Sequence, residues 1–162
     1  MKPVTVITAV AACLLLFYIV RKEMEKPWVP PERANSYLPH IYAAEAKYGL
    51  PHNMLARLLH QESRYREDII TGRVKSSAGA VGIAQIVPRW HPNVDPTDPI
   101  ESIYYAAGYL SRLYDQFGRW DKALAAYNWG PGNVRRHGIE NPPRETANYI
   151  TDILGDVPAV VA

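Results

Sequence analysis

The sequence predicts a mainly α-helical domain that follows a single N-terminal transmembrane helix. Three observations lead to this prediction. The chain begins with a long apolar run, most of the remainder places apolar residues at helical spacing, and strand signals are sparse. A length of 162 residues is typical of one domain, and a hydrophobic content of 48% supports a packed core.

The apolar run covers residues 4–20 and is interrupted only by two threonines. It is at the short end for a membrane span, which needs about 20 apolar residues, but flanking basic side chains can extend it by snorkelling. A cleaved signal peptide would need a small-residue site after the run, and none is present. A lipoprotein site at Cys13 is disfavoured, because the most apolar block, residues 14–20, follows the cysteine, where a mature lipoprotein would leave the membrane. We therefore expect a retained single-pass anchor.

We expect the chain to divide into this anchor with its short flanks at 1–25, a Pro-rich spacer at 26–35 and a helical domain at 36–162. Proline fixes φ and favours extended backbone, which predicts a stiff spacer. The basic residues beside the anchor weakly favour a cytoplasmic location for the domain.

The charge distribution argues against nucleic acid as a partner. The formal net charge of +2 arises within residues 1–33, which hold five basic and three acidic residues, so residues 34–162 are neutral. Binding to nucleic acid needs a basic face. The single cysteine, Cys13, allows no intramolecular disulfide, and the histidines show no metal-ligand spacing. We expect no metal and no cofactor.

The first half of the domain is expected to hold two helices. Ser36 is expected to cap a helix that runs to Tyr48 and ends at Gly49. Pro51 is expected in the first turn of the next helix, where its missing N–H costs nothing. Residues 66–97 are rich in turn formers and are expected to be irregular.

Three helices are expected in the second half. Asp98 followed by proline predicts the start of a long helix that Gly118 ends. An Ala-rich helix is expected over residues 120–129, ended by a glycine–proline–glycine sequence. A final helix is expected after the prolines at 142 and 143.

Glu62 stands out in the helix that follows Pro51. Leu55, Leu58, Leu59 and Glu62 fall at i, i+3, i+4 and i+7, the spacing of one helix face. A carboxylate on an apolar face is paired or functional, and an apolar setting raises its pKa toward that of a general acid. The alternative is that the helix ends here and Glu62 reaches water.

Three later segments carry polar residues beside turns. Residues 77–88 contain glycines that let a ligand approach the backbone, together with the amide of Gln85. Another segment places Tyr127 and Asn128 at the end of a helix. The third, residues 145–150, contains a glutamate and a tyrosine. Taken singly, each is better explained by core tyrosines and a satisfied loop amide.

In this order, the segments resemble the lytic transglycosylases of the soluble-transglycosylase (SLT) type in the lysozyme-like superfamily. The matching motifs are Glu-Ser at 62–63, Gly-Ala-x-Gly followed by Gln and Pro at 79–88, Ala-Tyr-Asn followed by Gly-Pro-Gly at 126–132, and Glu-Thr-x-x-Tyr at 145–149. The resemblance covers roughly residues 36–154 and implies a lysozyme-like fold. The chain departs from the family pattern in a longer segment before Ser77, in Ile83-Ala84 and in Trp129.

The resemblance implies that the substrate is peptidoglycan, cut between N-acetylmuramic acid (MurNAc) and N-acetylglucosamine (GlcNAc). Glu62 would protonate the leaving oxygen and then, as a base, activate the C6 hydroxyl of MurNAc, which gives a 1,6-anhydro end. By motif position, six further residues would line the cleft: Ser77, Gln85, Tyr127, Asn128, Glu145 and Tyr149. The expected partners are glycan strands and, through residues 4–20, a membrane.

Two other functions remain open at this stage. A lysozyme-type muramidase would use water and a second carboxylate, for which Asp68 and Glu145 are candidates. A catalytically idle peptidoglycan-binding or assembly protein is the alternative of another class. A peptidoglycan substrate places the domain on the periplasmic or outer side of the cytoplasmic membrane, against the weak charge bias. A virion-associated location is also compatible with the sequence.

Overall fold

The computed structural model describes residues 28–155 and residue 157. The expected anchor at residues 4–20 lies outside the described residues. Within the part that is described, no helix is both long enough and apolar enough to cross a membrane.

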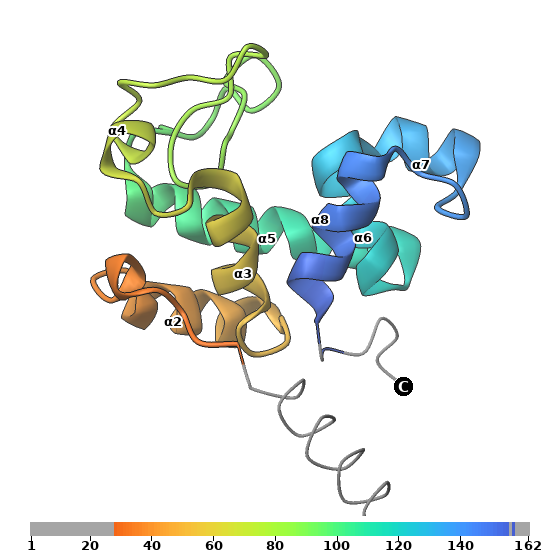
Figure 1. Ribbon diagram of the computed structural model, residues 1–162, viewed down its shortest axis with the longest axis horizontal. Coiled ribbons are helices and arrows are strands. Elements are labelled where there is room, and N and C mark those ends of the chain that lie inside the picture. The colour runs from red at the N-terminus through yellow and green to blue at the C-terminus, as the bar shows by residue number, and fades with distance from the viewer. Residues whose placement is uncertain (1–27, 156, 158–162) are drawn as a thin grey trace, which may run out of the picture.

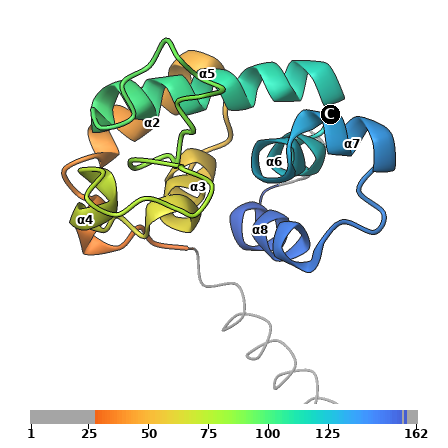
Figure 2. The same cartoon turned by 90° about the horizontal axis from the view of Figure 1, so that it is seen from above.

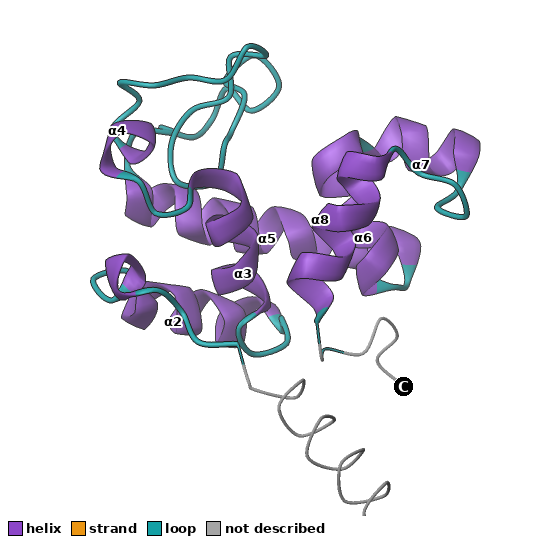
Figure 3. Ribbon diagram, viewed as in Figure 1, coloured by secondary structure: helices purple, strands orange, loops and turns teal. Residues whose placement is uncertain are grey.

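Helices joined by loops make up the described part of the chain, as Figure 3 shows. Pairing of extended segments is limited there to an isolated bridge between Val81 and Ile86. The prediction of a mainly α-helical domain is therefore confirmed. In chain order the helices are η1 (Glu32–Ala34), α2 (Leu38–Tyr48), α3 (Met54–Ser63), α4 (Glu67–Ile70), α5 (Pro99–Phe117), α6 (Trp120–Trp129), α7 (Pro131–His137) and α8 (Arg144–Leu154).

The long helix α5 runs across the molecule and connects two groups of elements (Figures 1 and 2). α2, α3, α4 and the loops between α4 and α5 lie around its N-terminal end, while α6, α7 and α8 lie around its C-terminal end. α5 packs against both α2 and α6, and α3 packs against α8. Fully buried side chains from both groups form one core, among them Leu58, Ile103, Leu110, Leu124 and Ile153.

Several predicted helix ends are confirmed. The Asp98 side chain accepts hydrogen bonds from the backbone N–H groups of Ile100 and Glu101, which caps α5. Gly49 and Gly118 end α2 and α5 with φ of 68° and 69°, in the left-handed region that glycine adopts without strain.

Two predicted helix starts are wrong. Ser36 does not cap α2, which begins at Leu38 after a turn. α3 begins at Met54 and not at Pro51. The start of α3 is fixed from outside the helix, because the buried carboxylate of Glu45 on α2 accepts hydrogen bonds from the N–H groups of Asn53 (3.1 Å) and Leu55 (2.9 Å). Local sequence cannot report a cap that comes from another helix.

Helix α7 was not predicted. The glycine–proline–glycine sequence after α6 is typical of a turn, but in the structure only Gly130, with φ of 94°, leaves the helical path. Pro131 then occupies the first position of α7, where a proline needs no hydrogen bond.

Candidate active site

Glu62 lies in the last turn of α3, on the same face as the fully buried Leu55, Leu58 and Leu59. The helix ends one residue later, where the Ser63 hydroxyl donates to the Leu59 carbonyl oxygen at 3.0 Å. Both interpretations of this glutamate are therefore partly right. The helix does end here, but the half-buried side chain of Glu62 faces a cleft and is held by another helix.

The holding contact comes from Tyr149 on α8, whose hydroxyl donates a hydrogen bond of 2.5 Å to Oε1 of Glu62. Burial, the largest influence, raises the pKa of Glu62 to about 7. The hydrogen bond from Tyr149 opposes this shift and the charge of Glu145 adds to it. At neutral pH the carboxyl group is thus poised between its two protonation states.

A cleft of about 630 Å³ opens in front of this carboxyl group. It brings together all seven residues that the sequence suggested: Glu62, Ser77, Gln85, Tyr127, Asn128, Glu145 and Tyr149. They come from α3, the loop before α5, the end of α6, and α8, so segments more than 80 residues apart meet at one site.

Four polar residues of the same cleft were missed by the motif comparison: Gln61, Ser76, Asn148 and Asp152. A signal for two of them was present in the sequence. Glu145, Asn148, Tyr149 and Asp152 follow the spacing of one helix face, and that face of α8 lines the cleft.

The loop that carries Ser77 and Gln85 is held by its own tight turn. Val81 and Ile86 exchange two backbone hydrogen bonds of 2.9 Å. Between them, Gly82 has φ of 81°, and a Cβ atom at this position would lie 1.8 Å from the carbonyl oxygen of Pro96. The side-chain amide nitrogen of Gln85 donates to the Gly82 carbonyl oxygen at 3.1 Å. This turn sets the wall of the cleft opposite α8.

Two residues at the end of α6 complete the wall. The hydroxyl of Tyr127 donates to the carbonyl oxygen of Ala84 at 3.0 Å and so ties α6 to the loop. The side-chain oxygen of Asn128 accepts a hydrogen bond of 2.8 Å from the buried hydroxyl of Thr146 on α8. This contact occupies the side-chain oxygen of Asn128, which lines the cleft, and leaves its amide N–H groups as the donors for a ligand.

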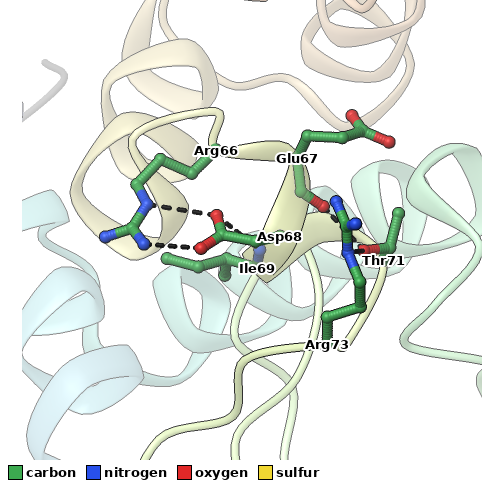
Figure 4. Close-up of polar contacts among 6 residues, drawn as sticks. All are labelled: Arg66, Glu67, Asp68, Ile69, Thr71 and Arg73. Atoms are coloured by element: carbon green, nitrogen blue, oxygen red, sulfur yellow. Dashed lines mark hydrogen bonds and ion pairs between the residues drawn. The ribbon is translucent and has the colours of Figure 1, made fainter.

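Asp68, one of the two candidate second carboxylates, does not reach this cleft. It forms a paired contact with the guanidinium group of Arg66, with nitrogen–oxygen distances of 3.1 Å and 2.6 Å (Figure 4). Both side chains of this pair are exposed to solvent. They line a separate hollow together with Arg33 and Tyr65. Glu145 does line the cleft of Glu62.

A second hollow, of about 680 Å³, adjoins the first. The two share Gln85, Val87, Tyr127 and Asn128, so they form one continuous groove. The second hollow is lined by six aromatic side chains: Trp90, His91, Tyr105, Tyr109, Tyr127 and Trp129. Across the described residues, no cluster of His, Cys, Asp and Glu side chains has the arrangement of a metal site.

The helical fold and the cleft that contains the Glu62 carboxyl group define the class of protein. Comparison with known families identifies this class. Residues 39–150 match the family described as "Transglycosylase SLT domain". The chain belongs to this family. It is also 31% identical over 113 residues to a protein of Enterobacteria phage PRD1 named "Transglycosylase". That match covers 60% of this chain and 41% of the phage protein, so the chain corresponds to less than half of its relative's length.

Proposed function

We propose that the protein is a lytic transglycosylase that cleaves the β-1,4 bond between MurNAc and GlcNAc in peptidoglycan and leaves a 1,6-anhydroMurNAc end. The observation that carries the proposal is the carboxyl group of Glu62, with a pKa raised to about 7 by burial, at the wall of an extended groove. Membership of the SLT family and the name of the phage relative support it.

In the first step, the protonated Glu62 donates its proton to the glycosidic oxygen while the bond from that oxygen to C1 of MurNAc breaks. Tyr149 occupies one oxygen of the carboxyl group, and no described residue hydrogen-bonds to the other. This second oxygen is the one available to the substrate. A carboxylic acid with a pKa near the working pH is well matched to this role.

In the second step, the Glu62 carboxylate accepts the proton of the C6 hydroxyl group. At the same time the oxygen of that hydroxyl group forms a bond to C1. The hydrogen bond from Tyr149 stabilises the carboxylate between the two steps. Because the nucleophile belongs to the substrate, much of the entropic cost of bringing it to C1 is already met. Glu62 ends the cycle protonated, and no water is consumed.

The other residues of the cleft would bind the sugars. Ser77, Gln85 and Asn128 offer donors and acceptors suited to hydroxyl and acetamido groups. Tyr127 would position the loop that lines the cleft, since its hydroxyl already donates to the carbonyl oxygen of Ala84. Burial raises the pKa of Tyr127, which keeps it neutral.

A muramidase is the second candidate, and Glu145 is the observation in its favour. This carboxylate lines the same cleft and its charge acts on Glu62, so it could activate a water molecule. Mass spectrometry of the digested glycan separates the two functions, because the anhydro product is lighter by one water. We expect anhydro ends; chiefly hydrated, reducing ends would make the protein a hydrolase.

Replacement of Glu62 by Gln tests the catalytic assignment. We expect cleavage to fall by at least about 10²-fold, the usual contribution of a general acid, with the fold kept. A zymogram that contains cell walls, run beside circular dichroism, measures both. Clearing by the wild type but not by the variant also excludes the idle binding protein. Digestion by the variant within a few-fold of wild type would show that Glu62 is not the acid.

We further propose that residues 1–25 anchor the protein in the cytoplasmic membrane and that the catalytic domain at 36–162 lies on the outer side. Residues 26–35 would link the two, with Trp28 and Ala34 packed against the core of the domain. The apolar run at 4–20 and the location of the substrate support this arrangement. Protease added to intact spheroplasts should degrade the domain. Survival of the domain until the membrane is permeabilised would place it inside.

A further inference from the structure

The aromatic hollow beside the cleft of Glu62 has a continuous wall of tyrosine rings. The rings of Tyr105 and Tyr109 stack with centroids 6.4 Å apart, and Tyr109 lies 5.6 Å from Tyr127. Tyr127 lines both hollows, so the wall begins at the cleft of Glu62 and continues away from it. Flat aromatic faces of this kind pack against the apolar faces of sugar rings.

Arg112 on α5 adds a positive charge to this wall. Its guanidinium carbon lies 5.7 Å from the centroid of the Tyr109 ring, and its exposed side chain lines the hollow. Among the described residues, no carboxylate forms an ion pair with Arg112. His91, which also lines the hollow, bonds through Nδ1 to the Tyr105 hydroxyl at 2.6 Å. Burial and the charge of Arg112 lower the pKa of His91, which leaves it neutral at pH 7 and Arg112 as the cation.

The two hollows differ in charge. The cleft of Glu62 is lined by three acidic residues, Glu62, Glu145 and Asp152, and by no Lys or Arg. The aromatic hollow is lined by Arg112 and by no Asp or Glu. A ligand with carboxylates is therefore repelled at one end of the groove and attracted at the other.

We propose that the aromatic hollow is a subsite for a carboxylate carried by the lactyl substituent of a MurNAc residue, with Arg112 as the group that binds it. This inference rests on the proposed function. In intact glycan the carboxylates belong to the stem peptide attached to that substituent, and in strands without stems the lactyl group itself is the carboxylate. GlcNAc carries neither.

This charge arrangement would set the register of the substrate. MurNAc and GlcNAc alternate along the strand, so a carboxylate bound at Arg112 fixes which sugars lie beside Glu62. Planar guanidinium groups bind carboxylates through paired hydrogen bonds, and Tyr109 helps to hold the plane of this one. Arg112 is thus a specificity-determining residue that does not touch the reacting atoms.

Binding measured without cleavage tests the subsite directly. The full chain carrying Glu62→Gln, kept in detergent, is titrated by calorimetry with three oligosaccharides of equal length. These are strands with stem peptides, the same strands stripped of stems by an amidase, and an uncharged GlcNAc oligomer. Each is measured with and without Arg112→Gln. Arg112→Lys tests for charge alone, and Arg135→Gln is the matched control, since Arg135 is exposed on α7 and lines neither hollow.

We expect Arg112→Gln to weaken binding of the carboxylate-bearing strands by about fivefold, the upper range for an exposed ion pair, and to leave the GlcNAc oligomer unchanged. Arg112→Lys should restore part of the loss, and Arg135→Gln should have no effect. Loss with stem-bearing strands alone assigns the stem carboxylates, and loss with stripped strands alone assigns the lactyl carboxylate. Equal loss with both shows that the subsite binds either carboxylate.

Equal weakening for all three ligands, or no weakening for any, would overturn the subsite. The proposed function is tested separately, by the anhydro product that the wild-type chain releases from intact cell walls. An active enzyme whose binding ignores Arg112 would refute only the subsite. An inactive chain that still shows the carboxylate preference would refute only the transglycosylase.

Discussion

Two neighbours act on the Glu62 carboxyl group in opposite directions. The Tyr149 hydroxyl donates to the carboxylate and so lowers its pKa, while the negative charge of Glu145 disfavours a second charge and raises it. In the proposed mechanism Glu62 acts as the acid only when it is protonated, so activity should fall as the pH rises through about 7.

Removal of each neighbour should therefore move this alkaline limb in opposite directions. Tyr149→Phe should shift it to higher pH, and Glu145→Gln should shift it to lower pH. The pH dependence of kcat/KM measures the shift, because it reports the free enzyme. Asp68→Asn is the control, since this carboxylate pairs with Arg66 outside the cleft. Shifts of equal sign for Tyr149→Phe and Glu145→Gln would contradict this account of Glu62.

Thr146 is buried and acts through Asn128. Its hydroxyl donates to the Asn128 side-chain oxygen at 2.8 Å, which fixes this amide at the wall of the cleft. Thr146→Val keeps the shape but removes the donor, so we expect a higher KM with a smaller change in kcat, at a stability cost of about 1–3 kcal/mol.

Thr146→Ser should restore KM, because it keeps the hydroxyl. Steady-state kinetics and thermal melts of both variants make the comparison. If Thr146→Val lowers the melting temperature but leaves KM unchanged, the residue is only structural.

At the scale of elements, the loop before α5 depends on one close backbone approach. Gly79 and Gly82 both have φ of 81°, but a Cβ at Gly82 would meet the Pro96 carbonyl oxygen, whereas nothing lies within 4 Å of one at Gly79. Gly82→Ala should therefore cost about 1–3 kcal/mol more than Gly79→Ala, which shares the strained φ but not the clash.

The displaced turn should also reduce activity, since it carries Gln85 and receives the Tyr127 hydroxyl at Ala84. Chemical denaturation and kcat/KM of the two variants provide the measurement. Equal stability of the two would mean that the contact with Pro96 does not hold the loop.

Across the whole molecule, Arg57 connects the helix of Glu62 to the helix of Tyr149. From α3, its buried side chain donates through Nη1 to the carbonyl oxygens of Ile153 (3.2 Å) and Leu154 (3.0 Å) at the end of α8. It also stacks at 5.5 Å on the ring of Trp28, which joins the start of the described chain to the same point.

Arg57→Met should leave these carbonyl oxygens without their donor, and we expect a loss of about 1–3 kcal/mol in the free energy of unfolding. Activity should fall as well, because α3 and α8 together hold the Glu62–Tyr149 pair. Urea denaturation measures the first effect. Arg64→Met, an exposed arginine just after α3, is the control and should change stability by no more than about 0.5 kcal/mol. A neutral Arg57→Met would show that packing alone aligns the two helices.

Local sequence determined much of this protein. Apolar spacing and capping residues predicted the mainly helical fold, the start of α5 at Asp98 and the ends of α2 and α5 at glycines, because these features depend on neighbours within one turn. The motif order pointed to Glu62 and to six residues that line its cleft.

Only the tertiary structure decided the rest, because the deciding contacts join distant segments. Glu45 sets the start of α3 from α2, Tyr149 holds Glu62 from α8, and Asp68 turns toward Arg66 and away from the cleft. The pKa of Glu62 belongs to the same group, since burial and a partner 87 residues away determine it. Sequence spacing could place a carboxyl group at the end of an apolar face, but only packing could surround it with the groups that tune its acidity.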